Sequence, residues 1–480
     1  MCVSAKAGFL LLALAPIVAW AEDVIRFGDP DEPSPPEEDV EEEPVTPSPW
    51  DFTLRHGLVE AGRFTDGSRS LDATGHARGI VRAERDPGEA WAIRLGARVT
   101  GFAQGGNRDA GYSRVNEADL DYDENWIRYR AQQWQLTLGA QKVFWGRVDG
   151  RPPTDRLGTE DLTRFVLDEP EERRRASPAV RVERFHGPWK VDVVALAGFR
   201  PAELPDQDSI WYPVDRASGR IVGLDTDTRL PDTDIALNTL VTPETDIDDD
   251  RSGSGGGGFR LGREGRDVDF AVTVQRARHS EPYFRASKAD LERIADFQED
   301  PPPAVASPIE RLVAEHPFTW VLGGDVAFGA GAWTWRAEAA WLSDAPVTRE
   351  QTWEYDTTEG AEWAIGAEGY PGWRDDLRLT LQLNGEHLLN NEDFLDPADT
   401  VSISGEVEDD SLLRHQLRAR LRFYAALNRN DTYLNPELAW TAFEPHELFI
   451  GGHWMDGDTD TAGGFYQDRR FVAVGWRGDW

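Results

Sequence analysis

The chain has 480 residues, a formal net charge of −36 and a mean hydropathy of −0.54, and 40% of its residues are hydrophobic. The polarity argues against membrane-spanning helices, and the acidity argues against a nucleic-acid partner, because phosphate contacts need a basic surface. The chain nevertheless carries 19 Trp, 21 Phe and 10 Tyr. A polar average with many aromatic residues is typical of a transmembrane β-barrel, whose strands face lipid on one side and a wet lumen on the other.

Residues 1–21 have the pattern of a cleaved secretory signal peptide. Lys6 supplies the charged start, residues 8–20 form the apolar stretch, and Ala19-Trp20-Ala21 is a small-x-small cleavage site. The apolar stretch is too short for a helix that spans a bilayer, which takes about 20 residues. The single cysteine, Cys2, lies before it, so we expect an exported chain without disulfides or thiolate chemistry.

Residues 22–49 are acidic and rich in proline. They hold eleven Asp or Glu and seven Pro, with Arg26 as the single basic residue. Such a segment cannot bury enough apolar surface to fold. We expect a disordered periplasmic linker, and the alternative is an arm that docks onto a basic periplasmic partner.

From residue 50 to residue 480 the sequence alternates between apolar and polar residues in repeated stretches. The clearest examples are 89–102, 333–341, 377–386 and 413–424. A period of two indicates strands with two unlike faces. One face is apolar enough for lipid, whereas the other is too charged for a packed core. The repetition predicts a transmembrane antiparallel β-barrel, although any single strand would also suit a soluble sandwich.

The breaks between these strands alternate in length. Short breaks carry turn residues, as at Gly187-Pro188 and Pro371-Gly372, whereas the long breaks cover 105–117, 147–176, 200–253, 278–315, 390–397 and 457–466. This alternation predicts short periplasmic turns and long extracellular loops. Two termini in the periplasm require an even strand number. Counting 399–406 and 411–427 as separate strands gives about eighteen, and sixteen stays open.

The terminal stretch, residues 471–480, alternates strictly and ends in an aromatic residue. Trp476 and Trp480 lie on its apolar face. We expect this strand to close the barrel against the first one, with the bilayer and the outer-membrane assembly machinery as partners. The predicted location is the outer membrane of a Gram-negative bacterium, although a soluble strand that happens to end in Trp has the same pattern.

Residues 139–201 contain a motif, G-x-Q-x-V-x-W-G, followed by D-G and D-L-x-R-F-x-L-D. The matching positions are Gly139, Gln141, Val143, Trp145, Gly146, Asp149, Gly150, Asp161, Leu162, Arg164, Phe165, Leu167, Asp168, Gly187 and Trp189. This pattern resembles a proteobacterial outer-membrane barrel family of unknown function. The resemblance implies a porin-like barrel that passes small or hydrophobic compounds, and it implies no catalytic residues. The run Arg173-Arg174-Arg175 departs from the family pattern, and residues 420–428 look shortened.

Charged residues on the polar faces predict the lining of the lumen. They are Arg94, Arg98, Arg336, Glu338, Arg378, Glu386, Arg414, Arg418, Arg420 and Arg422. Arginines on a lumen face attract anions and, set against carboxylates, create a transverse field. The alternative is that these residues only brace the barrel through salt bridges.

The break 147–176 is a candidate constriction. Its middle, residues 159–169, predicts a short helix with Leu162, Phe165 and Val166 on one stripe. We expect this loop to fold into the lumen, where its acidic residues offset the arginines, and the alternative is an exposed extracellular loop. The predicted constriction residues are Asp155, Asp161, Arg164, Phe165 and Asp168.

Few patterns in the chain point to catalysis or to metal binding. None of the nine histidines forms HxxxH or HExxH, and GxSxG does not occur. Asp246, Asp248, Asp249 and Asp250 lack the spacing of a known calcium loop, so a solvated acidic loop is the favoured interpretation. We therefore expect no enzyme activity, no metal site and no cofactor.

These observations predict an outer-membrane channel or transporter for small molecules, with hydrophobic or anionic compounds among the candidates. The alternative is a barrel with a plugged lumen that supports the membrane or docks a partner. A barrel enzyme is disfavoured. A periplasmic or inner-membrane transport partner is a further expectation for the channel.

Overall fold

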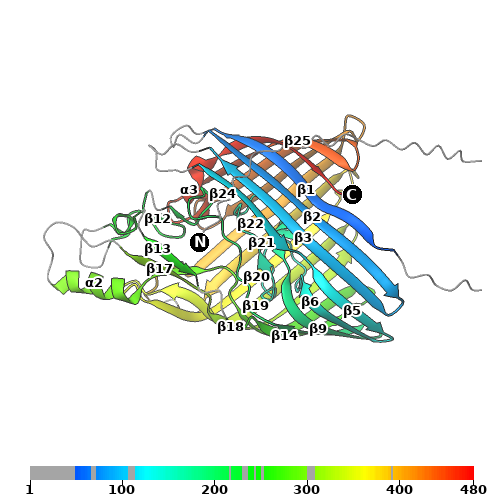
Figure 1. Ribbon diagram of the computed structural model, residues 1–480, viewed down its shortest axis with the longest axis horizontal. Coiled ribbons are helices and arrows are strands. Elements are labelled where there is room, and N and C mark those ends of the chain that lie inside the picture. Colours follow the sequence, from blue (N-terminus) through cyan, green and yellow to red (C-terminus); the bar gives the residue numbers. More distant parts are fainter. Residues whose placement is uncertain are drawn as a thin grey trace, which may run out of the picture. The chain divides into compact units, whose positions relative to one another are not determined.

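In the computed structural model, the alternating stretches form one closed antiparallel barrel (Figure 1). The structure describes residues 49–65, 72–105, 114–215, 218–229, 236–242, 245–249, 253–299, 309–390 and 393–480. The predicted signal peptide and nearly all of the predicted linker lie outside these residues. Among the described residues, no helix is both long enough and apolar enough to span a bilayer.

The barrel wall is built from nineteen strand segments. They are β1 (Asp51–Phe64), β2 (Ala73–Gly88), β3 (Trp91–Gln104), β4 (Val115–Tyr122), β5 (Asn125–Ala131), β6 (Trp134–Gln141), β9 (Ser177–His186), β10 (Trp189–Leu196), β14 (Gly256–Arg263), β15 (Val268–Arg278), β18 (Phe318–Ala330), β19 (Trp333–Thr348), β20 (Tyr355–Gly369), β21 (Leu377–Leu388), β22 (Asp399–Leu412), β23 (Leu417–Ala426), β24 (Asp431–Phe443), β25 (His446–Gly457) and β26 (Phe471–Gly478).

Two of these segments, β4 and β5, form a single interrupted strand. Both pair with β3, and the interruption lies at Asp123 and Glu124. Gly96 on β3 makes room for it, because a Cβ atom there would lie 3.1 Å from the Asp123 Cβ and from the Glu124 carbonyl oxygen. The barrel therefore has 18 strands, which confirms the larger of the two predicted numbers.

The barrel closes between its first and last strands, as the sequence predicts. β1 and β26 pair antiparallel from Gly57 opposite Gly478 to Phe64 opposite Phe471. Trp480 extends the closure, because its main-chain N–H and C=O both bond to Leu54, at 2.8 and 2.7 Å. Closure leaves the barrel sheet without an edge strand in the part of the chain that the structure describes, which is what a β structure in lipid requires.

Most connections are short at one end of the barrel and long at the other, as predicted. The first end is named here the short-turn end and the second the long-loop end. The exceptions are residues 370–376, a longer turn at the short-turn end, and residues 427–430, a short turn at the long-loop end. Outward-facing aromatic rings line the short-turn end, with Trp91 against Tyr129 (ring centroids 4.8 Å apart) and Trp440 against Phe443 (5.0 Å). Such a band suits a membrane interface.

One predicted strand boundary is wrong. Residues 411–412 belong to β22, and residues 413–416 form a turn before β23. Leu413, Arg414 and His415 all have positive φ angles of 47°, 61° and 64°. The alternation of residue types continues through this turn and no Gly or Pro marks it, so the sequence pattern could not show where the strand ends.

Long loops build a cap at the long-loop end, made of the described parts of residues 197–255 and 279–317. Figure 1 shows α2, β12, β13 and β17 gathered beside the barrel strands at this end. The cap elements are β11 (Val214–Asp215), β12 (Arg220–Ile221), η2 (Leu237–Thr239), β13 (Asp246–Asp249), β16 (Tyr283–Ala286), α2 (Lys288–Glu299) and β17 (Arg311–Glu315), and the loop 458–470 adds α3 (Ala462–Phe465) and η3 (Gln467–Arg469).

The cap has its own apolar contacts, which show no periodic pattern in the sequence. One cluster joins Trp211 and Tyr466 to Phe471, the first residue of β26. A second cluster joins Leu240 and Trp353 to Leu312. The acidic stretch considered for calcium forms strand β13, which pairs parallel with β17, and Arg311 lies 3.6 and 3.8 Å from its two carboxylates at Asp246 and Asp248. Asp250 lies outside the described residues.

Candidate functional site: the constriction loop and the lumen

Residues 142–176, named here the constriction loop, connect β6 to β9 and make side-chain contacts with both sides of the barrel wall. The loop contains β7 (Thr159–Glu160), α1 (Pro170–Arg173) and β8 (Arg174–Arg175). The helix predicted within 159–169 is therefore misplaced. Residues 159–160 pair with 174–175 instead, and Pro170 fits the first turn of a helix that begins there.

The motif at the start of the loop directs the chain inward. The buried Trp145 indole donates to the Asp192 carboxylate on β10 at 3.0 Å, while Val143 packs in the same apolar cluster. Gly146 has a φ of +110°, and a Cβ atom there would lie 2.6 Å from Pro152 Cβ and 2.8 Å from Glu338 Oε1. Only glycine combines this conformation with this close approach.

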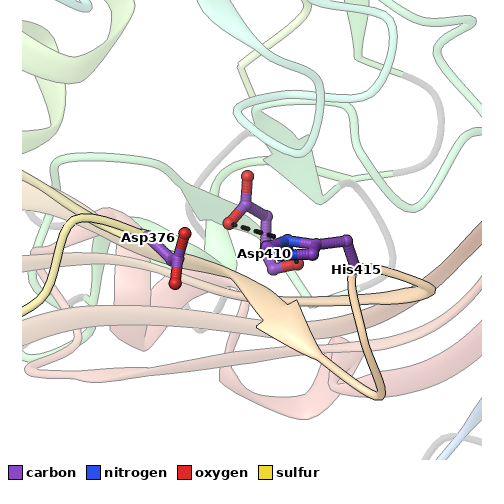
Figure 2. A group of neighbouring side chains, drawn as sticks. All are labelled: Asp376, Asp410 and His415. Carbon is purple, nitrogen blue, oxygen red and sulfur yellow. Dashed lines mark hydrogen bonds and ion pairs between the residues drawn. The ribbon is translucent and has the colours of Figure 1, made fainter.

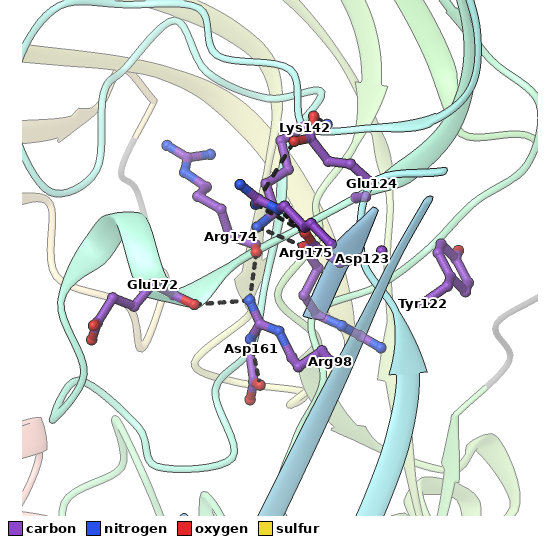
Figure 3. Close-up of polar contacts among 12 residues, drawn as sticks. Arg98, Tyr122, Asp123, Glu124, Lys142, Asp161, Glu172, Arg174 and Arg175 are labelled. Atoms are coloured by element: carbon purple, nitrogen blue, oxygen red, sulfur yellow. Dashed lines mark hydrogen bonds and ion pairs between the residues drawn. The ribbon is translucent and has the colours of Figure 1, made fainter. Parts of the chain in front are cut away.

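Arg98 on β3 anchors the loop to one side of the wall (Figure 3). Its guanidinium donates to Asp161 Oδ2 at 3.0 Å and to the main-chain oxygens of Glu172 and Arg174, both at 2.9 Å. The Arg98 side chain is buried, so these charge-assisted bonds act in a low-dielectric setting. Arg98 therefore joins two segments of the loop, one at Asp161 and one at residues 172–174.

A second buried cluster adds to this anchor. Asp168 accepts from Arg164 within the loop at 2.7 Å and pairs with Arg78 on β2 at 3.0 Å, while Arg164 also pairs with Glu60 on β1. Burial alone would raise the pKa of Asp168, but the guanidiniums of Arg164 and Arg78 outweigh it and hold that pKa well below its usual range. Neither Arg78 nor Glu60 was among the predicted site residues, although both lie on alternating strands.

The opposite wall holds the loop with a different set of groups. Glu338 on β19 accepts from the Thr154 amide (2.7 Å), the Thr154 hydroxyl (2.6 Å) and the Arg147 amide (3.0 Å). Gln382 on β21 exchanges two hydrogen bonds with the main chain of Asp149, at 2.9 and 3.0 Å. Glu338 thus positions the loop by accepting hydrogen bonds from its N–H and O–H groups. The sequence predicted Glu338 only as a carboxylate that lines the pore.

The arginine run at residues 173–175 also holds the loop in place. Arg174 pairs with the buried Asp155, and Arg175 bridges Asp121 on β4 (2.8 Å) and Glu203 in the cap (2.9 Å). The cap in turn bonds to the loop through its main chain, where the Leu162 amide donates to the Glu203 oxygen at 2.8 Å. Wall, constriction loop and cap therefore form one connected polar network.

The predicted lumen arginines lie on the inner face, with one exception, and nearly all are neutralised. Arg420 pairs with Glu169 of the loop and with Glu437, and Arg422 donates to Asn435 and to the Leu167 oxygen. The remaining ion pairs are Arg94 with Glu84 and Glu124, Arg336 with Asp149 and Glu368, Arg378 with Glu368, Glu406 and Glu408, and Arg418 with Glu408 and Glu447. The exception is Arg414, which lies exposed in the turn between β22 and β23, so its prediction as a pore-lining residue is wrong.

Several cavities border the constriction loop, including one of about 680 Å³ against β3 and β4 and the three that are described next. An apolar chamber of about 290 Å³ lies between the loop and the cap, an inner chamber of about 570 Å³ lies between the loop and strands β20 to β25, and a side chamber of about 270 Å³ lies against β19 to β21. Leu162 and Phe165 line both the apolar and the inner chamber. Phe165 has a φ of 55°, a left-handed conformation that is uncommon for an aromatic residue and marks a constrained turn.

Glu386, the last of the predicted lumen residues, lies on β21 where the inner and side chambers meet. Its side chain makes no hydrogen bond or ion pair with any residue that the structure describes.

The aromatic residues predicted to close the barrel, Trp476 and Trp480, lie at the short-turn end, where their ring centroids are 5.3 Å apart.

One group of possible metal ligands lies at the short-turn end (Figure 2). Asp376, Asp410 and His415 bring one ligand atom each within 4.8 Å of the others, and all three are exposed. The His415 imidazole already lies 3.1 Å from the Asp410 main-chain oxygen. Exposed carboxylates at tight turns are common without an ion, and nothing else here indicates a ligand.

The fold and the loop together define a class of protein, a transmembrane barrel whose lumen is narrowed by an inward-folded loop. Among solved structures, the chain is similar to OccAB1 of Acinetobacter baumannii (TM-score 0.47, 7% identity, 90% of this chain and 96% of that one), the outer membrane channel DcaP of the same organism (0.40, 10%, 90% and 97%) and Salmonella typhi OmpF in complex with daunomycin (0.40, 9%, 90% and 97%).

Similarities of this size carry no functional argument, so the assignment of the barrel rests on its own strand pairing. No protein-family model matches the chain, and neither does any curated protein. The family resemblance of the motif at residues 139–168 therefore stays a prediction.

Proposed function

We propose that this protein is an outer-membrane channel that passes small molecules across the barrel, with the constriction loop as the narrowest region. The observation that carries the proposal is the space left around the loop. Chambers of about 290, 570 and 270 Å³ adjoin one another through shared lining residues, whereas a barrel that served only as a structural plug would fill this volume with side chains.

The apolar chamber supports a path for compounds with a hydrophobic body. Leu224, Phe284 and Trp353 line it, and its charged rim groups already have partners. Asp396 accepts from the Tyr283 hydroxyl at 2.9 Å, and Arg285 pairs with Glu315 at 2.6 Å. An uncharged apolar group can enter such a chamber without leaving a buried charge unpaired.

Leu162 and Phe165 form the partition between the apolar and inner chambers, so they are the residues that test this path. In liposomes, the double variant Leu162→Ala, Phe165→Ala should take up uncharged solutes faster than the wild type, as followed by liposome swelling. The matched control is Leu413→Ala, which removes an exposed leucine from a short turn. Equal swelling rates for all three proteins would contradict the proposed path.

The second candidate function is a barrel with a closed lumen that docks a partner. The cap favours this function, because its side chains pack together at the long-loop end. Trp211 and Tyr466 belong to one apolar cluster there, and the buried Arg469 donates to the Ile210 main-chain oxygen. If wild-type liposomes do not swell while the barrel is folded, this second function replaces the first.

A further inference from the structure

The passage between the side chamber and the inner chamber has an excess of negative charge. Its shared lining consists of Arg151, Glu281, Glu362, Glu386 and Thr400. Three carboxylates therefore face one guanidinium. A second guanidinium, that of Arg156 in the constriction loop, pairs with Glu362 on β20.

The ion pairs account for two of these three carboxylates. Arg151 lies 3.5 Å from Glu281, and Arg156 is bound to Glu362. Glu386 stands directly opposite Glu362 across the β20–β21 pair. None of the described guanidiniums forms a salt bridge with it, although those of Arg151 and Arg156 act on it electrostatically. Its side chain is exposed and lines both chambers at the passage.

The arginines that were expected to favour anions do not balance this charge. Arg420 is bound by Glu169 and Glu437, and Arg378 is bound by Glu406 and Glu368. A guanidinium already paired with a carboxylate contributes little net field to a passing ion, whereas a carboxylate without a salt bridge leaves a net negative charge at the passage.

We infer that the passage at Glu386 selects for small cationic solutes over anionic ones, with Glu386 as the specificity-determining residue. This inference rests on the proposed channel function and gives it a substrate class. It departs from the expectation of an anion-favouring arginine row, because in the folded barrel those arginines are held by the constriction loop and by neighbouring strands.

The test is the permeability ratio of K⁺ to Cl⁻, measured from the reversal potential of the purified full-length protein in a planar bilayer under a KCl gradient. A unit charge about 4 Å from an ion in water changes the ion's local population roughly fivefold. We expect the wild type to favour K⁺ and Glu386→Gln to lower the ratio by roughly that factor, most clearly at low salt, where screening is weakest.

The control variant is Glu350→Gln, which removes the same charge from an exposed side chain in the turn between β19 and β20 at the long-loop end. Glu350 itself lines none of the three chambers. Its ratio should equal that of the wild type. A conducting wild type that favours Cl⁻, or a Glu386→Gln variant that behaves like Glu350→Gln, would overturn the inference and leave the channel function standing. A folded wild type without any conductance would overturn the channel function and the inference with it.

Discussion

Replacing Arg98 by alanine should release the constriction loop from β3. The guanidinium makes three hydrogen bonds to the loop, at 2.9 to 3.0 Å, and the side chain is only 4% exposed. Removing one partner of a buried ion pair costs about 3–5 kcal/mol. Because about 1.4 kcal/mol is a factor of ten, local opening of the loop should become more frequent by roughly a hundredfold or more.

Hydrogen exchange of the folded barrel measures this opening directly. The reporter amide is Asp161, which donates to the Arg173 oxygen at 2.7 Å across the base of the loop. In Arg98→Ala it should exchange faster by about two orders of magnitude, whereas amides of the β1–β26 closure keep their protection. Arg98→Lys should give an intermediate rate, since lysine keeps the charge and loses the forked geometry. If Asp161 exchanges at the wild-type rate in Arg98→Ala, the proposed anchor is wrong.

Four further predictions concern other contacts of the loop and of the closing strand. The pKa of Asp168 lies well below its usual range, so its stabilising contribution is complete above about pH 4 and is lost as the pH falls further. Hydrogen exchange of the amides of residues 163–173 should therefore become faster in acid for the wild type and should depend less on pH in Asp168→Asn. The pKa of Glu169 is lowered to about 2, because Arg420 and Arg422 outweigh the effect of burial, and Glu169→Gln should likewise reduce the acid response. Gly146→Ala should strain the start of the loop and lower the midpoint of heat-induced unfolding, whereas Gly331→Ala, at a turn with open space, probes the cost of a positive φ alone. Deleting Trp480 should reduce the amount of barrel assembled in the outer membrane without reducing export, and normal assembly would contradict its closing role.

Much of the barrel could be predicted from the sequence, because lipid on one side and water on the other impose a period of two on every strand. The alternation in 89–102 identifies β3 and places Arg98 inside, and the lengths of the breaks identify the two ends. The inward loop was predictable from its acidic residues set against lumen arginines. Its helix was misplaced because Leu162 and Phe165 have helical spacing, yet they form the partition between two chambers instead.

The cap and the partners of individual charges were not predictable in the same way. Loops that pack on one another show no periodicity, so the contact of Trp211 with Tyr466 left no pattern in the sequence. The sequence also could not show that Glu338 accepts main-chain N–H groups or that Arg414 lies in a turn. Arginines on alternating positions indicate a lumen face, but only the folded chain shows that Arg420 is neutralised by Glu169, which lies 251 residues away.

We propose that the constriction loop sets the width of an otherwise open lumen. The most direct test is the single-channel conductance of the wild type and of a variant in which residues 150–172 are replaced by a short Gly-Ser linker. Both proteins should first show the heat-dependent gel migration of a folded barrel. We predict small, discrete steps for the wild type and several-fold larger steps for the variant. Equal conductance in the two proteins, or no conductance in either, would contradict the claim.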